Sequence, residues 1–154
     1  MAVAASGALY AAFAVASAWL ALTDLRTRRI PNRVLGTASL VMVACGAVSS
    51  IAGADPLRFA WAAGAAVVYA AAGFVLWLLA PAHALGGGDV KLAPLIGFAA
   101  GWAGAEAAFL WTPIGIAVAS MSALVWARAH GRRTLAFGPV LLAGAWMAIL
   151  ASWG

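Results

Sequence analysis

The sequence is divided into six uncharged apolar runs, separated by short stretches that hold nearly all of the charged residues. The runs cover residues 1–23, 34–54, 59–80, 92–105, 107–127 and 134–154. A helix needs about 20 apolar residues to cross the hydrocarbon core of a bilayer, and five of the runs reach that length. Only 8% of the residues are charged, whereas a soluble domain has about a quarter. The sequence therefore predicts an all-α, polytopic membrane protein.

The run 92–105 is the shortest, and its 14 residues would cover about 21 Å of a core that is roughly 30 Å thick. The charges nevertheless favour six transmembrane helices, because basic residues follow the first, third and fifth runs. Eight of the nine basic residues lie there: Arg26, Arg28, Arg29, Arg33, Lys91, Arg128, Arg132 and Arg133. An odd number of spans would destroy this segregation. The positive-inside rule then places these loops in the cytoplasm and both termini on the outer, periplasmic side.

Consecutive spans and short loops use the whole length, so we expect residues 1–154 to form one integral-membrane domain. The run 1–23 has no basic residue before it, which favours a retained helix over a cleaved signal peptide. The basic residues are expected to contact anionic lipid head groups rather than nucleic acid. Cys45 is the only cysteine, which excludes a disulfide within the chain and a cysteine-rich metal site. Nothing in the sequence indicates a metal, a cofactor or an oligomeric state.

Two of the four carboxylates lie at the inner ends of predicted helices. Asp24 follows the first run and Asp89 precedes the fourth, whereas Asp55 and Glu106 fall in outer loops. A structural interpretation is available for both inner acids. Asp89 is a favoured residue to cap a helix after a glycine run, and Asp24 could balance the arginines that follow it. Pro31-Asn32 is similarly a helix-start signal, with Asn32 as the cap.

A catalytic interpretation explains the two acids together. Acidic side chains at membrane depth cost about 2.5–3.5 kcal/mol at the bilayer centre, so those present usually have a function. Two carboxyls brought close in a poorly solvated site share one proton. The ionised carboxyl can take a proton from water while the protonated one polarises a scissile carbonyl. As a hypothesis, Lys91 would hold Asp89 ionised as the base, with Asp24 protonated.

The same residues carry a resemblance to a known family. Asp24 with Ile30-Pro31-Asn32, and Gly86-Gly87-Gly88-Asp89-Val90-Lys91-Leu92, resemble the signature segments of the type IV prepilin peptidases, which are GxGD-type membrane aspartic proteases. Phe137-Gly138-Pro139 is similar to a third family segment. The resemblance implies a hydrolase of the cell inner membrane that removes a short basic leader from prepilin-like precursors at the cytoplasmic face. It also implies two catalytic aspartates, Asp24 and Asp89.

The remaining matched residues are given supporting or substrate-binding roles by the resemblance: Pro31, Asn32, Gly86, Gly87, Gly88 and Lys91. Glycines beside Asp89 would let an extended substrate backbone approach closely. The sequence departs from longer bacterial members, which carry a cytoplasmic segment with paired cysteines, so methyltransferase activity is expected to be absent. The compact length is similar to that of peptidases of tight-adherence (Flp-type) pili and of archaeal preflagellin peptidases.

Two alternatives from another class are a channel and a non-enzymatic scaffold. A channel should have polar residues through the depth of the membrane, and the apolar runs are nearly bare of them. A scaffold would tolerate replacement of either aspartate by asparagine. A third alternative keeps the peptidase chemistry and changes the substrate, for example to a preflagellin. His83 and His130 are expected to be interfacial residues rather than catalytic bases.

Overall fold

A computed structural model describes residues 2–27, 30–79, 86–131 and 136–152. Every regular element in these ranges is helical, which confirms the all-α prediction. The α-helices are α1 (Ala2–Thr27), α2 (Asn32–Gly53), α3 (Pro56–Leu79), α4 (Gly87–Ala103), α5 (Thr112–Ala129) and α6 (Phe137–Ala151). A π-helical turn, η1 (Ala107–Trp111), leads directly into α5.

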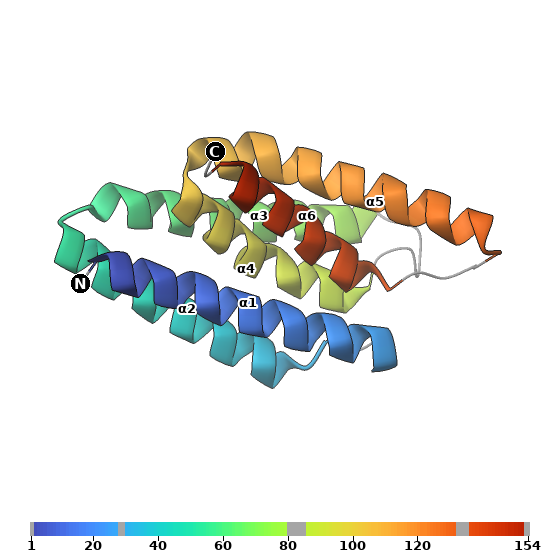
Figure 1. The fold of residues 1–154 in the computed structure, drawn as a ribbon, viewed down its shortest axis with the longest axis horizontal. Coiled ribbons are helices and arrows are strands. Elements are labelled where there is room, and N and C mark those ends of the chain that lie inside the picture. Colours follow the sequence, from blue (N-terminus) through green and yellow to red (C-terminus); the bar gives the residue numbers. More distant parts are fainter. Residues whose placement is uncertain (1, 28–29, 80–85, 132–135, 153–154) are drawn as a thin grey trace.

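Successive helices run in opposite directions through the bundle (Figure 1). At one end, which we term the basic end, α1, α3 and α5 finish and α2, α4 and α6 begin. Of the described basic residues, Arg26, Arg33, Lys91 and Arg128 lie on these helix ends, and Arg58 is at the opposite end near the start of α3. The remaining predicted residues of this end, Arg28, Arg29, His83, Arg132 and Arg133, lie outside the described residues.

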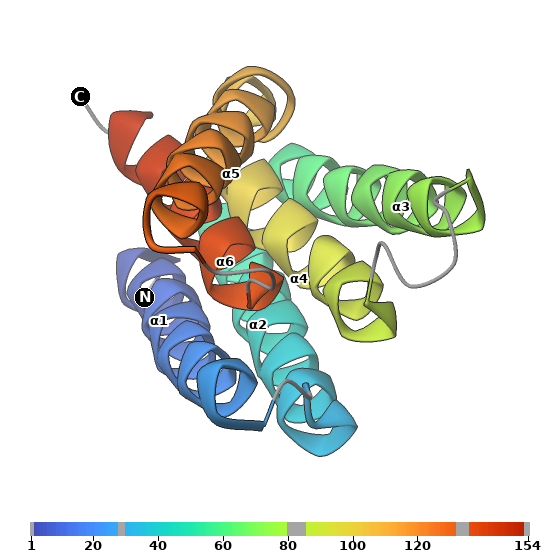
Figure 2. The same ribbon diagram turned by 90° about the vertical axis from the view of Figure 1, so that its right-hand side faces the viewer.

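Within the described ranges the number of α-helices equals the number of predicted spans, and four segments there are long and apolar enough to cross a membrane. These are Ala4–Thr27, Asn32–Gly53, Pro56–Leu79 and Ala107–Ala129. Helix α6 has 15 residues and α4 has 17. Helix α4 lies at the centre of the bundle (Figure 2), in contact with α1, α2, α3, α6 and η1. Because protein surrounds it, α4 does not need the length of a lipid-facing span.

The core of the bundle forms around α4. Its largest fully buried side chains include Phe13 and Leu20 of α1, Met42 of α2 and Trp102 of α4. Helices α3 and α4 touch through glycines: a Cβ built on Gly97 would lie 2.6 Å from the Ala65 carbonyl oxygen, and one on Gly101 would lie 2.7 Å from the Ala62 Cα. Gly97 and Gly101, which are four residues apart, thus allow the two helices to approach closely.

Candidate active site

Asp24 projects from α1 into the start of α6 at the basic end. Its side chain is 7% exposed, and its Oδ2 accepts a hydrogen bond of 3.1 Å from the backbone N–H of Gly138. The first amides of a helix have no partner within the helix, and the N-cap residue of α6, Ala136, supplies no side-chain acceptor. Asp24 therefore satisfies an amide of α6 from another helix, where the helix dipole favours a negative charge.

Asp89 is the third residue of α4 and lies ahead of the apolar run 92–105. The N-cap residue of α4 is Gly86, without a side-chain cap, so the alternative that Asp89 caps this helix is wrong. The backbone N–H of Asp89 donates to the Gly86 carbonyl oxygen at 3.0 Å. Burial, and secondly the charge of Asp24, raise the pKa of Asp89 above the ordinary value of a carboxyl. A separate hydrogen bond, between the Asp89 carboxyl and the Gly86 backbone, offsets part of the rise.

The two aspartates line one pocket, which we term the dyad pocket, with a volume of about 400 Å³. Its residues come from α1, the start of α2 and the start of α4: Asp24, Ile30, Asn32, Gly86, Gly87, Gly88, Asp89 and Lys91. Of the eight residues that were assigned catalytic, supporting or substrate-binding roles from the sequence, Pro31 alone is not part of this lining. Pro31 is the N-cap residue of α2, and its carbonyl oxygen accepts the Leu35 amide at 3.2 Å. Pro31 thus fixes where α2 begins.

Lys91 and Asn32 join the starts of α4 and α2. The Lys91 Nζ donates to the Asn32 Oδ1 at 3.0 Å, so the expectation that Asn32 caps α2 is wrong: it is the first helical residue and its side chain reaches across to α4. The hypothesis that Lys91 holds Asp89 ionised finds no support in this arrangement. Positions two apart on a helix do not face each other, and the pKa of Asp89 is raised rather than lowered.

A glycine lies against each of the two carboxylates, at a position where a side chain would crowd the carboxylate oxygen. A Cβ on Gly86 would lie 3.1 Å from the Asp89 Oδ2, and one on Gly138 would lie 2.9 Å from the Asp24 Oδ2. A Cβ on Gly88 would meet the Ile30 side chain at 3.2 Å, whereas one on Gly87 would have no neighbour within 4 Å. Gly88 is therefore a packing position, and Gly87 faces open space beside the pocket.

Gly138 is the residue of this site to which the sequence assigned no role. The signal was present in the Phe137-Gly138-Pro139 segment, which resembles a family motif. The contact of Gly138 with Asp24 could not be predicted from the sequence, because the two residues are 114 positions apart in the chain. The first turn of α6 is thus part of the site.

The other two carboxylates have structural partners at the opposite end of the bundle. Asp55 Oδ1 accepts the backbone N–H of Arg58 at 3.1 Å at the start of α3. Glu106 Oε1 accepts the indole N–H of Trp111 at 3.1 Å. Across the described ranges, no group of three or more His, Cys, Asp or Glu side chains could hold a metal ion. The ionisable side chains that line the dyad pocket are those of Asp24, Asp89 and Lys91.

Residues 11–129, which include both aspartates, match the type IV leader peptidase family. A prepilin leader peptidase/N-methyltransferase of Bacillus subtilis (strain 168) is 34% identical over 134 residues, which make up 85% of this chain and 50% of that protein. The chain thus spans about half the length of this curated relative. No solved structure matches the chain significantly. The family match covers well over half of the sequence, so the resemblance is confirmed and the chain belongs to the type IV leader peptidase family.

Proposed function

We propose that this chain is a membrane-embedded aspartic endopeptidase that removes the leader from type IV prepilin-like precursors. The observation that carries the proposal is the dyad pocket, in which Asp24 of α1 and Asp89 of α4 line one cavity of about 400 Å³. Family membership supports peptidase chemistry, and the name of the Bacillus subtilis relative supports a prepilin as the substrate. Both catalytic roles and the substrate are proposals for this chain.

The surroundings of the two carboxyls suggest which one holds the shared proton. The raised pKa of Asp89 favours its protonated form, and the Gly138 amide donates to Asp24. Asp24 is then the base, which reverses the roles expected from the sequence. Asp24 takes a proton from water while the water oxygen bonds to the scissile carbonyl carbon, and Asp89 gives its proton to the carbonyl oxygen.

The second half of the reaction restores the pair. Asp24 gives its proton to the amide nitrogen, the C–N bond breaks, and Asp89 takes back the proton from the hydroxyl of the intermediate as the carboxyl product forms. One water is consumed and neither aspartate is changed. Gly87 has no neighbour within 4 Å of a Cβ position, which leaves space for the backbone of the substrate beside Asp89.

In the cell we place the basic end of the bundle at the cytoplasmic face of the inner membrane, with both termini outside. Arg26, Arg33 and Arg128 would then contact anionic lipid head groups, at about 1 kcal/mol each. All 154 residues are proposed to act as one peptidase domain, without methyltransferase activity. Cys45, the only cysteine, is partly buried in α2, away from the dyad pocket.

The direct test is co-expression with a candidate prepilin and measurement of leader removal by gel shift. We expect the wild-type chain to convert the precursor to the shorter form. A variant carrying both Asp24→Asn and Asp89→Asn should give none, at equal abundance in the membrane. Cleavage by the double variant would exclude an aspartic mechanism at this pocket.

The Lys91–Asn32 hydrogen bond leads to a prediction about pH dependence. Activity should fall as pH rises through the raised pKa of Asp89, because both carboxyls are then ionised and no proton remains for the substrate carbonyl. Lys91→Met should leave this alkaline limb in place and lower the rate about two- to tenfold, the value of one hydrogen bond of about 0.5–1.5 kcal/mol. Rate profiles of leader removal from pH 5 to 9 measure both effects.

Asn32→Ala is the matched control, since it removes the other partner of the same hydrogen bond. Its rate loss should equal that of Lys91→Met, and the double variant should lose no more than either single one. If Lys91→Met instead moves the acidic limb to higher pH, Lys91 stabilises the Asp89 carboxylate as the base, and the roles of the two aspartates must be exchanged.

A further inference from the structure

A second cavity adjoins the dyad pocket at Asp89. It has a volume of about 580 Å³ and is lined by residues of α3, α4, α5, α6 and η1. Asp89 is the one charged residue among these, and the rest of the lining is apolar apart from the Tyr69 hydroxyl. That hydroxyl donates to the Ala108 carbonyl oxygen at 2.6 Å and so satisfies the π-helical turn. We term this cavity the apolar groove.

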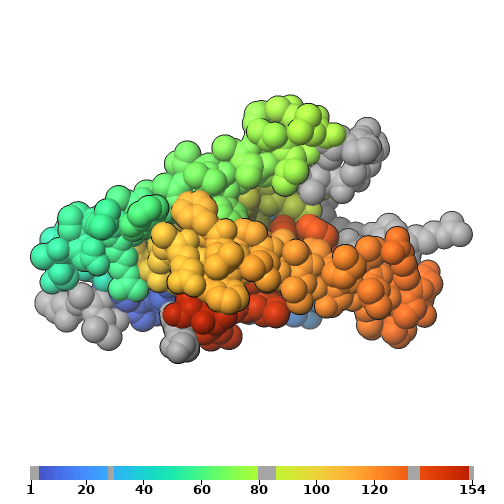
Figure 3. All heavy atoms as spheres, turned by 90° about the horizontal axis from the view of Figure 1, so that it is seen from above, coloured from blue at the N-terminus to red at the C-terminus, as the bar shows by residue number. Residues whose placement is uncertain are grey.

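The apolar groove is open to the side of the bundle. Its walls are α3 and α5, which diverge toward the basic end, and α4 and α6 are visible between them (Figure 3). Along α4 the lining extends from Asp89 to Ile96, which is about 10 Å or two helical turns. Leu76 and Phe109, on the two walls, are 59% and 45% exposed. An apolar helix in the bilayer can therefore reach the groove laterally.

We propose that the apolar groove binds the apolar segment of the precursor next to the scissile bond, an inference that rests on the proposed function. The occupant follows from continuity: Asp89 lines both the groove and the dyad pocket, so a chain held in the groove continues directly to the carboxyl pair. Ala72 and Ala117 are small and exposed, which leaves space for close helix packing in the groove. When the two carboxyls share one proton the pair carries a single negative charge, which disfavours an anionic lipid head group at the same end.

The two cavities together define what the substrate must present. The dyad pocket offers polar side chains of Asn32 and Lys91, whereas the groove offers hydrocarbon over two turns. The scissile bond would therefore lie where a polar segment of the substrate meets an apolar helix. The apolar side chains of that helix that contact the groove would be spaced three and four residues apart, on one face.

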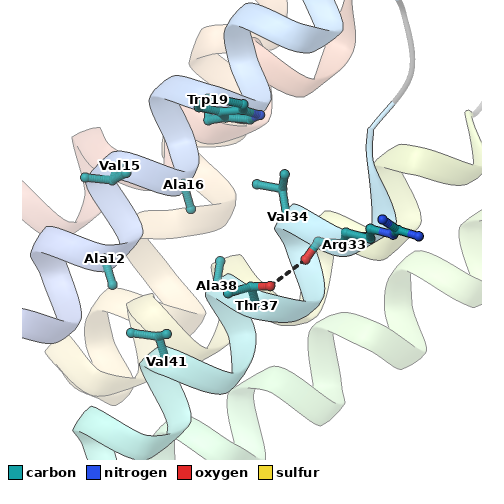
Figure 4. A pocket seen from close by; sticks show the side chains of 9 residues that line it. All are labelled: Ala12, Val15, Ala16, Trp19, Arg33, Val34, Thr37, Ala38 and Val41. Atoms are coloured by element: carbon teal, nitrogen blue, oxygen red, sulfur yellow. Dashed lines mark hydrogen bonds between the residues drawn. The ribbon is translucent and has the colours of Figure 1, made fainter.

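A third cavity serves as a control because it lacks the connection to the carboxyl pair. It has a volume of about 440 Å³ and lies between α1 and α2, with Val15, Trp19, Val34 and Val41 among its lining (Figure 4). Its volume is about three-quarters of that of the apolar groove, and its lining is apolar apart from Arg33 and Thr37. The Thr37 hydroxyl donates to the Arg33 carbonyl oxygen of its own helix. It shares no residue with the dyad pocket.

The test is site-specific photocrosslinking in the Asp24→Asn background, with the prepilin that the wild-type chain processes. Benzoylphenylalanine replaces Ala117 in the groove or Val15 in the control cavity, and both positions are exposed. We expect an adduct with the prepilin at 117 and none at 15. Adducts at 117 with only lipid or a second copy of the chain, or prepilin adducts at 15 alone, would overturn the inference while leaving the proposed function standing. If the wild type processes no prepilin, both proposals fall.

A second experiment separates binding from chemistry. Ala72→Trp fills the groove from α3, and Ala71→Trp adds the same bulk to the same helix at an exposed position that lines none of the described pockets. We expect Ala72→Trp to raise KM for the prepilin at least tenfold with little change in kcat, and Ala71→Trp to match the wild type. Equal KM values for the two variants would show that the groove does not hold the substrate.

Discussion

Asp24→Asn is expected to lower leader removal by about 10³-fold while leaving the helix bundle intact. An asparagine Oδ1 can still accept the backbone N–H of Gly138, which lies 3.1 Å from the Asp24 Oδ2. It cannot take a proton from water, so the structural contact is kept and the proposed base is lost. The rate is measured by gel shift with a co-expressed prepilin, and the stability by thermal unfolding in detergent.

Asp24→Ala is the comparison that makes this result specific. It removes the base and also leaves the Gly138 amide, which is part of a buried contact, without its acceptor. An orphaned buried donor costs about 1–3 kcal/mol, so this variant should be inactive and less stable. If Asp24 served only to cap α6, as a scaffold protein would require, Asp24→Asn would retain the wild-type phenotype. Substantial processing by Asp24→Asn would therefore contradict the catalytic role.

Much of the fold follows from the sequence because apolar length and charge placement are direct physical constraints. The uncharged runs predicted the helices closely: 34–54 corresponds to α2 (Asn32–Gly53), and 59–80 to α3 (Pro56–Leu79). Basic residues after alternate runs predicted that α1, α3 and α5 end at the same side of the bundle.

The packing of the bundle could not be predicted in the same way. Nearly every face of every helix is apolar, so periodicity does not indicate which face is buried. The central place of α4 and the apolar groove beside it therefore had no signal in the sequence. One contact of the π-helical turn is also tertiary, since the Ala108 carbonyl is bound by the Tyr69 hydroxyl of α3, whereas the Ala107 carbonyl is bound by the neighbouring Thr112.

The sequence predicted the residues of the site more successfully than the hydrogen bonds between them. The two aspartates and the three glycines before Asp89 were identified from their types and positions, and the structure brings them to one pocket. The partners of Asn32 and Asp24 were not, because Lys91 lies 59 residues from Asn32 and Gly138 lies 114 residues from Asp24. Hydrogen bonds of this range depend on helix packing that a single apolar sequence does not specify.

Gly97→Ala is expected to destabilise the bundle by about 1–3 kcal/mol, the usual cost of forcing a methyl group into a closed contact. The added Cβ would lie 2.6 Å from the Ala65 carbonyl oxygen and 2.9 Å from the Tyr69 Cβ, so α3 must move away from α4. Gly64→Ala is the matched control on α3, since a Cβ there would have no neighbour within 4 Å. It should be neutral, or stabilising by up to about 1 kcal/mol through helix propensity.

Thermal unfolding of the two variants in detergent compares them directly, and equal stability would show that α3 and α4 are not in close contact at Gly97. The same displacement should reach the site. Helix α4 carries Asp89, α3 is one wall of the apolar groove, and Tyr69 of α3 binds the Ala108 carbonyl of η1. We therefore expect Gly97→Ala to lower leader removal at temperatures where the variant is still folded, because moving α3 widens the groove without touching either carboxyl.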